Sequence, residues 1–282
     1  MASNIKIVAD SSADFYNLDG VEFSSAPLKI VNSEKEYVDD ENLDVKKMVE
    51  ELLQYKGKVS TACPGPGDWI KAFGDAETVI AVAISSHLSG SYNSLLTAKQ
   101  VYESEYPERR VYALDSINAG PGMQLLVYKI KELIEADVPY EKICEEIEEY
   151  KKKVSIVFML SSVHNFANNG RVNPLIAKAI GILNIKLVAK GSLKGEIKII
   201  SKVRGDKKGL PKMIEHIDEE GITGEKIIIG HVYNENLALQ MKDILQERFP
   251  NAEIKVYQLH GLCSFYAESG GLLVAFESTN RQ

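Results

Sequence analysis

Residues 78–94 read TVIAVAISSHLSGSYNS, and this stretch decides the fold. Its first six residues are apolar and rich in β-branched side chains, which is typical of a parallel strand buried on both faces. Five serines and a tyrosine follow within residues 84–94. The stretch therefore predicts a central strand that ends in a hydroxyl-rich loop.

Strands and helices alternate on both sides of this stretch. The run IKIVA (5–9) and the run RVYALDS (110–116) are further predicted strands, and we expect one strand over FSSAPLKIVN (23–32). Amphipathic helices are predicted between these strands, and residues 185–205 are expected to form a short antiparallel group. The pattern predicts a two-domain α/β protein with a mostly parallel sheet in residues 1–155 and a second α/β domain in residues 156–282.

Composition excludes several classes of protein. The 282 residues carry a net charge of −7, which disfavours nucleic acid or an anionic membrane as the main partner. Three widely spaced cysteines indicate reduced, intracellular usage. The N-terminus lacks the apolar region of a signal peptide, and no apolar run approaches the roughly 20 residues that span a bilayer. We therefore expect a cytoplasmic protein.

Hydroxyl groups recur where the predicted strands end. Ligands of open α/β sheets bind beyond the carboxyl ends of the strands. Asp and Ser at these positions often only cap the next helix, but the serine loop exceeds what capping needs. Its Gly90 permits close approach of a ligand to the backbone. Hydroxyls and backbone N–H groups suit a carboxylate or a phosphate oxygen.

The usual catalytic and metal motifs are missing from the sequence. It contains no HExxH zinc motif, no GxSxG elbow, no Walker A loop and no GxGxxG loop. A serine-dependent hydrolase or transferase remains an alternative, because Ser89, His87 and Asp10 or Asp115 could converge. A scaffold that binds a phosphate ligand on the same fold is a second alternative.

Six segments together resemble the DegV family of fatty-acid-binding proteins, which serve as the B subunit of bacterial fatty acid kinase. In chain order they are KIVADSSADF (6–15), VSTACPGPGDW (59–69), ISSHLSGSYNSLLTA (84–98), VYALDS (111–116), NNGRV (168–172) and KVRGDKKGL (202–210). The resemblance covers nearly the whole chain. It implies a non-catalytic subunit without cofactor or metal that holds one long-chain fatty acid between two α/β domains. The kinase A subunit would phosphorylate the carboxylate, and transient membrane contact is compatible with this role.

The resemblance also implies roles for particular residues. The carboxylate would meet residues of three motifs and of the segment near the C-terminus: Thr61, Ser89, Gly90, Ser91, Arg171 and Tyr266. The basic stretch Arg204, Lys207 and Lys208 would face the kinase. Tyr266 stands where many members have a histidine, and it donates a hydrogen bond without carrying a charge. The acyl-chain tunnel is expected to involve Ile176, Ile180, Leu183 and Phe265.

Overall fold

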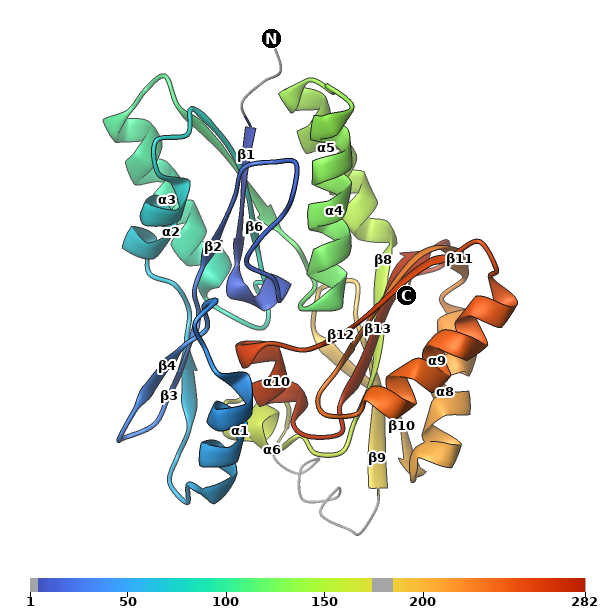
Figure 1. The fold of residues 1–282 in the computed structure, drawn as a ribbon. Helices are drawn as coiled ribbons and strands as arrows, with labels where there is room; N and C mark the ends of the chain where they lie inside the picture. Colours follow the sequence, from blue (N-terminus) through green and yellow to red (C-terminus); the bar gives the residue numbers. More distant parts are fainter. Residues whose placement is uncertain (1–4, 174–184, 282) are drawn as a thin grey trace.

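The computed structural model describes residues 5–173 and 185–281. The described chain forms three β-sheets with helices packed around them (Figure 1). The first sheet has the order β2-β1-β6-β7 and is parallel throughout. Its strands are β1 (Ile5–Asp10), β2 (Phe23–Ala26), β6 (Thr78–Ala83) and β7 (Arg110–Asp115). The mixed α/β fold with a parallel N-terminal sheet is therefore confirmed.

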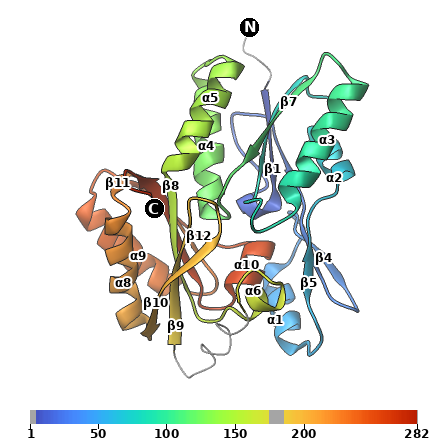
Figure 2. The same ribbon diagram turned by 180° about the vertical axis from the view of Figure 1, so that it is seen from behind.

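The run TVIAVA is the inner strand β6, and helices cover both of its faces. Val79 and Ala81 face a cluster with Trp69 and Leu95, whereas Ile80 and Val82 face another cluster. This alternation follows from the two-residue period of a strand. The covering helices are α2 (Pro66–Phe73) and α3 (Ser91–Glu105) on one face (Figure 2), and α4 (Pro121–Glu135) and α5 (Tyr140–Tyr150) on the other.

The segment 23–32 forms two strands in two different sheets, so the expectation of one strand is wrong. Pro27 lies between β2 and β3 (Lys29–Val31), and it has no N–H group to donate to a ladder. Strand β3 joins a small antiparallel sheet of order β4-β3-β5. This sheet contains β4 (Glu36–Val38) and β5 (Ser60–Ala62), which α1 (Val45–Gln54) connects. The Asp44 carboxylate caps α1 by accepting the Lys47 N–H at 2.9 Å.

The third sheet has six strands in the order β10-β9-β8-β13-β11-β12. Only the β11–β12 pair is parallel, and the β9–β10 pair is antiparallel as expected. The strands are β8 (Val154–Leu160), β9 (Ile185–Gly191), β10 (Ile197–Arg204), β11 (Ile222–His231), β12 (Glu253–Gln258) and β13 (Leu272–Ser278). Helices α8 (Asp206–Glu219) and α9 (Glu235–Arg248) cover one face, and α6 (His164–Asn168) and the short α10 (Gly261–Ala267) lie on the side of the first sheet (Figure 1). The division of the chain after residue 155 stays a prediction.

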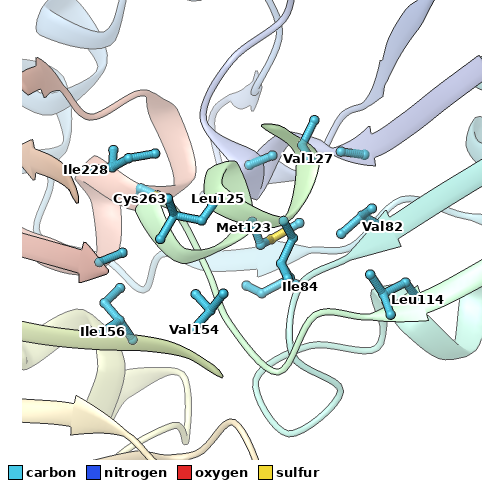
Figure 3. Close-up of a cluster of buried hydrophobic side chains, with 14 of the residues drawn as sticks. Val82, Ile84, Leu114, Met123, Leu125, Val127, Val154, Ile156, Ile228 and Cys263 are labelled. Carbon is cyan, nitrogen blue, oxygen red and sulfur yellow. The ribbon is translucent and has the colours of Figure 1, made fainter. Parts of the chain in front are cut away.

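One hydrophobic cluster joins the parallel sheet to the six-stranded sheet. Helix α4 supplies Met123, Leu125 and Val127 to this cluster, and α10 supplies Cys263. Figure 3 shows these side chains between two groups of residues: Val82 and Leu114 of the first sheet with Ile84, which follows β6, on one side, and Val154, Ile156 and Ile228 of the third sheet on the other. The two sheets therefore share a core. Among the helices of the described chain, none has the length and apolarity to cross a membrane.

Replacing Leu125 should destabilise both sheets together. Leu125 is 1% exposed in the shared cluster, so Leu125→Ala removes buried methyl groups and is expected to cost about 2–5 kcal/mol. Urea unfolding followed by circular dichroism should show one transition at a lower midpoint. Leu53→Ala is the matched control, because Leu53 is 71% exposed and its truncation should change the free energy of unfolding by less than about 0.5 kcal/mol. Two separate transitions in Leu125→Ala would contradict a shared core.

Candidate functional site

A mostly apolar cavity lies where the carboxyl ends of β6 and β7 meet the six-stranded sheet. It contains about 870 Å³ of empty space, part of which is open to solvent. Ile84 and Leu88 follow β6, and Ile117 follows β7. Strand β8 contributes Ile156, Phe158 and Leu160, while Val157 and Met159 between them pack on the α8 side. The alternation of β8 thus gives one face to the cavity and the other to the core.

Helix α10 forms a second wall of the cavity with Leu262, Cys263, Tyr266 and Ala267. Two buried carboxylates hold the start of this helix. Asp14 accepts the His260 N–H at 3.1 Å, and Asp39 accepts the Leu262 N–H at 3.1 Å and the Tyr16 hydroxyl at 2.7 Å. Burial raises the pKa of both Asp14 and Asp39. The sequence did not reveal these anchors, because the acids lie far from α10 along the chain.

Two hydroxyls meet at the cavity. Thr61 Oγ1 on β5 lies 2.7 Å from Tyr266 Oη, and both residues line the cavity. The Tyr266 ring stacks on Phe166 with ring centres 4.8 Å apart. Burial raises the pKa of Tyr266, so its phenol remains a neutral hydrogen-bond donor. Because only one of the two hydroxyl protons is used in this hydrogen bond, the other hydroxyl can donate to a ligand in the cavity.

Arg171 brings a positive charge to the same place. Its Nε donates to the carbonyl of Leu88 at 3.0 Å, and its Nη1 donates to the carbonyl of Asn169. The guanidinium carbon lies 5.9 Å from the centre of the Tyr266 ring. No carboxylate of the described residues forms an ion pair with Arg171. Backbone carbonyls therefore orient this cation without neutralising it.

The serine loop divides its groups between the cavity and the interior. Ser89 lines the cavity, and its Oγ accepts the Ser91 N–H at 3.2 Å. Ser91 is fully buried, and its hydroxyl donates to Asp10 Oδ2 at 2.6 Å. Gly90 is the residue before α3, and a methyl group on it would lie 3.4 Å from the Cys63 sulfur. The structure brings together Thr61, Ser89, Arg171 and Tyr266, whereas Gly90 and Ser91 are not among the cavity residues.

Asp10 is the residue that fixes this loop. Besides Ser91, it accepts the Ile84 N–H at 2.8 Å and both the N–H and the hydroxyl of Ser12. Asp10 is fully buried, and burial raises its pKa to about 6 although these bonds oppose the rise. These four bonds occupy the carboxylate, and within residues 5–173 and 185–281 no hydrogen bond joins Ser89 to His87. The described structure does not assemble the catalytic trio that the sequence permits.

The remaining predicted residues lie elsewhere. Phe265 is buried but packs against Ile30, Tyr37 and Met48, so it is not part of the cavity wall. Ile176, Ile180 and Leu183 fall outside the described residues. In residues 261–276 the sequence did not single out four cavity residues: Leu262, Cys263, Ala267 and Leu273. Leu273 alternates with the core residue Leu272.

The predicted basic stretch is at the surface. Arg204 ends β10, and Lys207 and Lys208 lie in the first turn of α8, where all three side chains are exposed. Asp206 between them pairs with Lys186 at 3.2 Å. Of the residues that the structure describes, no three His, Cys, Asp or Glu side chains are grouped so as to hold a metal ion.

The parallel sheet, the mixed sheet and the apolar cavity between them define an α/β protein of the DegV type. The model of the DegV family matches residues 4–278, and the chain belongs to this family. The "DegV domain-containing protein" of Streptococcus gordonii is 38% identical over 276 residues, which cover 96% of this chain and 98% of that protein.

Two solved structures are similar over nearly their whole length. A DegV family protein from Eubacterium eligens loaded with heptadecanoic acid has a TM-score of 0.95 and 37% identity, covering 98% of this chain and 100% of that chain. The fatty acid kinase B3 protein of Streptococcus pneumoniae, loaded with linoleic acid, has a TM-score of 0.95 and 36% identity, covering 98% of this chain and 99% of that chain.

The raised pKa of Asp10 should make stability depend on pH. The folded protein keeps this proton up to about pH 6, whereas the unfolded chain releases it near 3.8. The contribution of Asp10 to stability is therefore complete below pH 3.8 and is lost as the pH rises to 6, by about 3 kcal/mol in total. Wild type should exceed Asp10→Asn in free energy of unfolding by more at pH 4 than at pH 7.

Urea unfolding from pH 4 to pH 7 measures this difference. Asp19→Asn, at an exposed aspartate, is the matched control and should follow the wild-type profile. A difference between wild type and Asp10→Asn that stays constant with pH would show that Asp10 titrates in the folded protein as it does in the unfolded chain.

Proposed function

We propose that this chain binds one long-chain fatty acid in the cavity and presents its carboxylate to a partner kinase subunit for acyl-phosphate formation. The observation that carries the proposal is the composition of the cavity: mostly apolar walls in which Thr61, Ser89, Arg171 and Tyr266 form one polar cluster, with Asn118 and Glu196 as the other polar lining residues. A fatty acid has the same division into one anionic group and a long apolar tail. The two fatty-acid-loaded relatives of the same family support this choice of ligand.

The apolar wall would supply most of the affinity. Burying a methylene group stabilises by about 0.8 kcal/mol, so a tail of about 16 carbons contributes far more than two or three hydrogen bonds. The polar cluster would then fix the orientation of the ligand. When Tyr266 donates to Thr61, the Thr61 hydroxyl proton is free to donate to a carboxylate oxygen. Ser89 supplies a second hydroxyl, and Arg171 supplies a positive charge.

Removing the two hydroxyls should weaken binding. Thr61→Val with Ser89→Ala deletes two donors to a buried anion, and each charge-assisted bond is worth about 1–3 kcal/mol. The dissociation constant for oleate, measured by isothermal titration calorimetry, should rise at least tenfold. Ser86→Ala in the same loop is the matched control, because Ser86 is exposed and does not line the cavity. Equal affinities in wild type and the double variant would remove these hydroxyls from the site.

The transfer of phosphate would be the task of the partner. The sequence contains no Walker A loop. The exposed residues Arg204, Lys207 and Lys208 would form the surface that meets the fatty acid kinase A subunit. None of these three side chains lines the cavity, so docking and binding can be tested independently.

Arg204→Ala should separate the two roles. Oleate affinity should stay as in wild type, while acyl-phosphate formation in the presence of a bacterial fatty acid kinase A subunit, ATP and magnesium should fall at least fivefold. Lys212→Ala is the control, because Lys212 lies on the same helix in a surface ion pair with Glu215. Without the A subunit, no acyl-phosphate should form. Acyl-phosphate formation by this chain alone would contradict the presenting role. A wild-type rate in Arg204→Ala would contradict the docking surface.

A further inference from the structure

The turn between β9 and β10, residues 191–197, covers part of the cavity. Gly191, Gly195, Glu196 and Ile197 all line it. Within the turn, Ser192 N–H donates to the Glu196 carbonyl and Gly195 N–H to the Ser192 carbonyl, each at 2.9 Å. Strand β10 is the edge of its sheet, and its pairing with β9 shifts register between Ile199 and Ser201. The turn is thus stabilised by its own backbone hydrogen bonds, and the β9–β10 hairpin that carries it has an irregular register.

Two side chains from outside this hairpin hold the turn against the rest of the molecule. Ser85, two residues after the end of β6, donates its hydroxyl to the Gly195 carbonyl at 2.8 Å. Arg281 donates through Nη2 to the Ser192 carbonyl at 3.1 Å. The same nitrogen donates to the Ile117 carbonyl at 3.3 Å, and Nη1 donates to the Lys151 carbonyl at 2.7 Å. Arg281 therefore ties the turn to the loop after β7, which is another part of the cavity wall.

The contact at Gly195 is close. A methyl group at this position would lie 2.2 Å from the Ser85 hydroxyl oxygen and 2.9 Å from the Ile117 Cα atom. The φ angle of Gly195 is +79°, a region that side chains other than glycine rarely adopt. The turn thus meets the Ser85 side chain and the Ile117 backbone at close range, and only glycine fits at this point.

The other described walls are fixed more firmly. Strand β8 lies between two bonded neighbours in its sheet, and α10 begins on the buried carboxylates Asp14 and Asp39. Moving either of them breaks a sheet ladder or exposes buried acids. Moving the turn breaks the bonds from Ser85 and Arg281 and the packing of Ile197 against the shared hydrophobic cluster, but no sheet ladder to β8 and no contact of a buried acid. Local opening occurs where few contacts must be broken, so the turn is the wall that opens at least cost among the described walls.

We propose that the β9–β10 turn is a hinged gate through which the ligand enters and leaves the cavity, with Ser85 and Arg281 as its latch. This gate rests on the proposed function for the identity of the ligand. Arg281 suits a latch because burial lowers its pKa only to about 10, so it remains charged at neutral pH. Charged donors make stronger hydrogen bonds to carbonyls than neutral donors do. Neither latch residue belongs to the cluster of Thr61, Ser89, Arg171 and Tyr266.

Ligand exchange kinetics test the gate. The probe is cis-parinaric acid, a fluorescent 18-carbon fatty acid, followed by stopped flow with the full chain. Arg281→Ala and Ser85→Ala should each raise the association and dissociation rates about fivefold to tenfold, because each removes one of the two side-chain hydrogen bonds that hold the turn. The dissociation constant should change less than about threefold. Arg281→Lys keeps the charge but not the planar fork, and its rates should lie between those of wild type and Arg281→Ala.

The head-group variant provides the contrast. Thr61→Val with Ser89→Ala should raise the dissociation rate and the dissociation constant together, with the association rate unchanged. Hydrogen exchange of the ligand-free protein provides a readout that needs no ligand. The amides of residues 192–198 should exchange faster in Arg281→Ala than in wild type, while those of β8 should not.

Each result decides a separate point. Unchanged exchange of residues 192–198 in Arg281→Ala would overturn the latch. If the amides of residues 192–198 exchange faster in Arg281→Ala but the ligand rates stay as in wild type, the ligand does not enter or leave past this turn. If wild type does not bind cis-parinaric acid at all, the proposed function fails and the gate fails with it, which differs from binding with unchanged rates.

Discussion

A buried carboxylate at the end of the first strand organises this protein. Asp10 has no exposed surface, yet it accepts hydrogen bonds from the Ile84 backbone and from the Ser12 and Ser91 side chains. These partners belong to the segments that leave β1 and β6 and to the start of α3. Without this acceptor, several buried donors would lie unpaired at the end of the sheet, each at a cost of about 1–3 kcal/mol. The same bonds hold the loop that presents Ser89 to the cavity.

The cavity follows from the way in which the two large sheets share helix α4. Its Met123, Leu125 and Val127 belong to the cluster that joins both sheets, so the cavity walls are built on a common core (Figure 3). The parallel sheet contributes the loops beyond its carboxyl ends, and β8 contributes one face of a strand. Ligand sites at the carboxyl ends of parallel strands are open in many α/β proteins. Here the six-stranded sheet and its β9–β10 turn cover that edge and make it apolar.

The sequence predicted the parts of this arrangement that depend on local pattern. Buried parallel strands are continuous apolar runs, and β6 was predicted for that reason. The cluster of Thr61, Ser89, Arg171 and Tyr266 was predicted from a family resemblance, and the structure brings these residues together across more than 200 positions of the chain. Whether they bind a carboxylate remains a prediction.

Sequence reasoning could not foresee the features of the site that depend on tertiary contacts. Ser91 looks like its neighbour Ser89 in the sequence, but its hydroxyl turns inward to Asp10, and only the pairing of β1 with β6 brings the two together. Phe265 and Tyr266 are adjacent on α10, yet helix geometry directs Phe265 to Ile30 and Met48 and Tyr266 to the cavity. Pro27 is a local signal for the break between β2 and β3, and the prediction of one strand overlooked it.

On the proposed function, the polar cluster has to satisfy two opposing demands. It must hold a carboxylate firmly enough to orient it, and it must leave an oxygen nucleophilic enough to attack a phosphoryl group. A bidentate arginine fork would neutralise the carboxylate strongly. In this structure two guanidinium nitrogens of Arg171 already donate to the carbonyls of Leu88 and Asn169. Arg171 would therefore act on the carboxylate mainly through its positive charge and not through a bidentate pair of hydrogen bonds. The hydroxyls of Thr61, Ser89 and Tyr266 donate without adding charge. Tyr266 also retains its proton across the physiological pH range, because burial raises its pKa above the usual value of 10. Neutral hydrogen-bond donors beside an arginine that is held by backbone carbonyls would therefore orient the carboxylate and leave its oxygen nucleophilic.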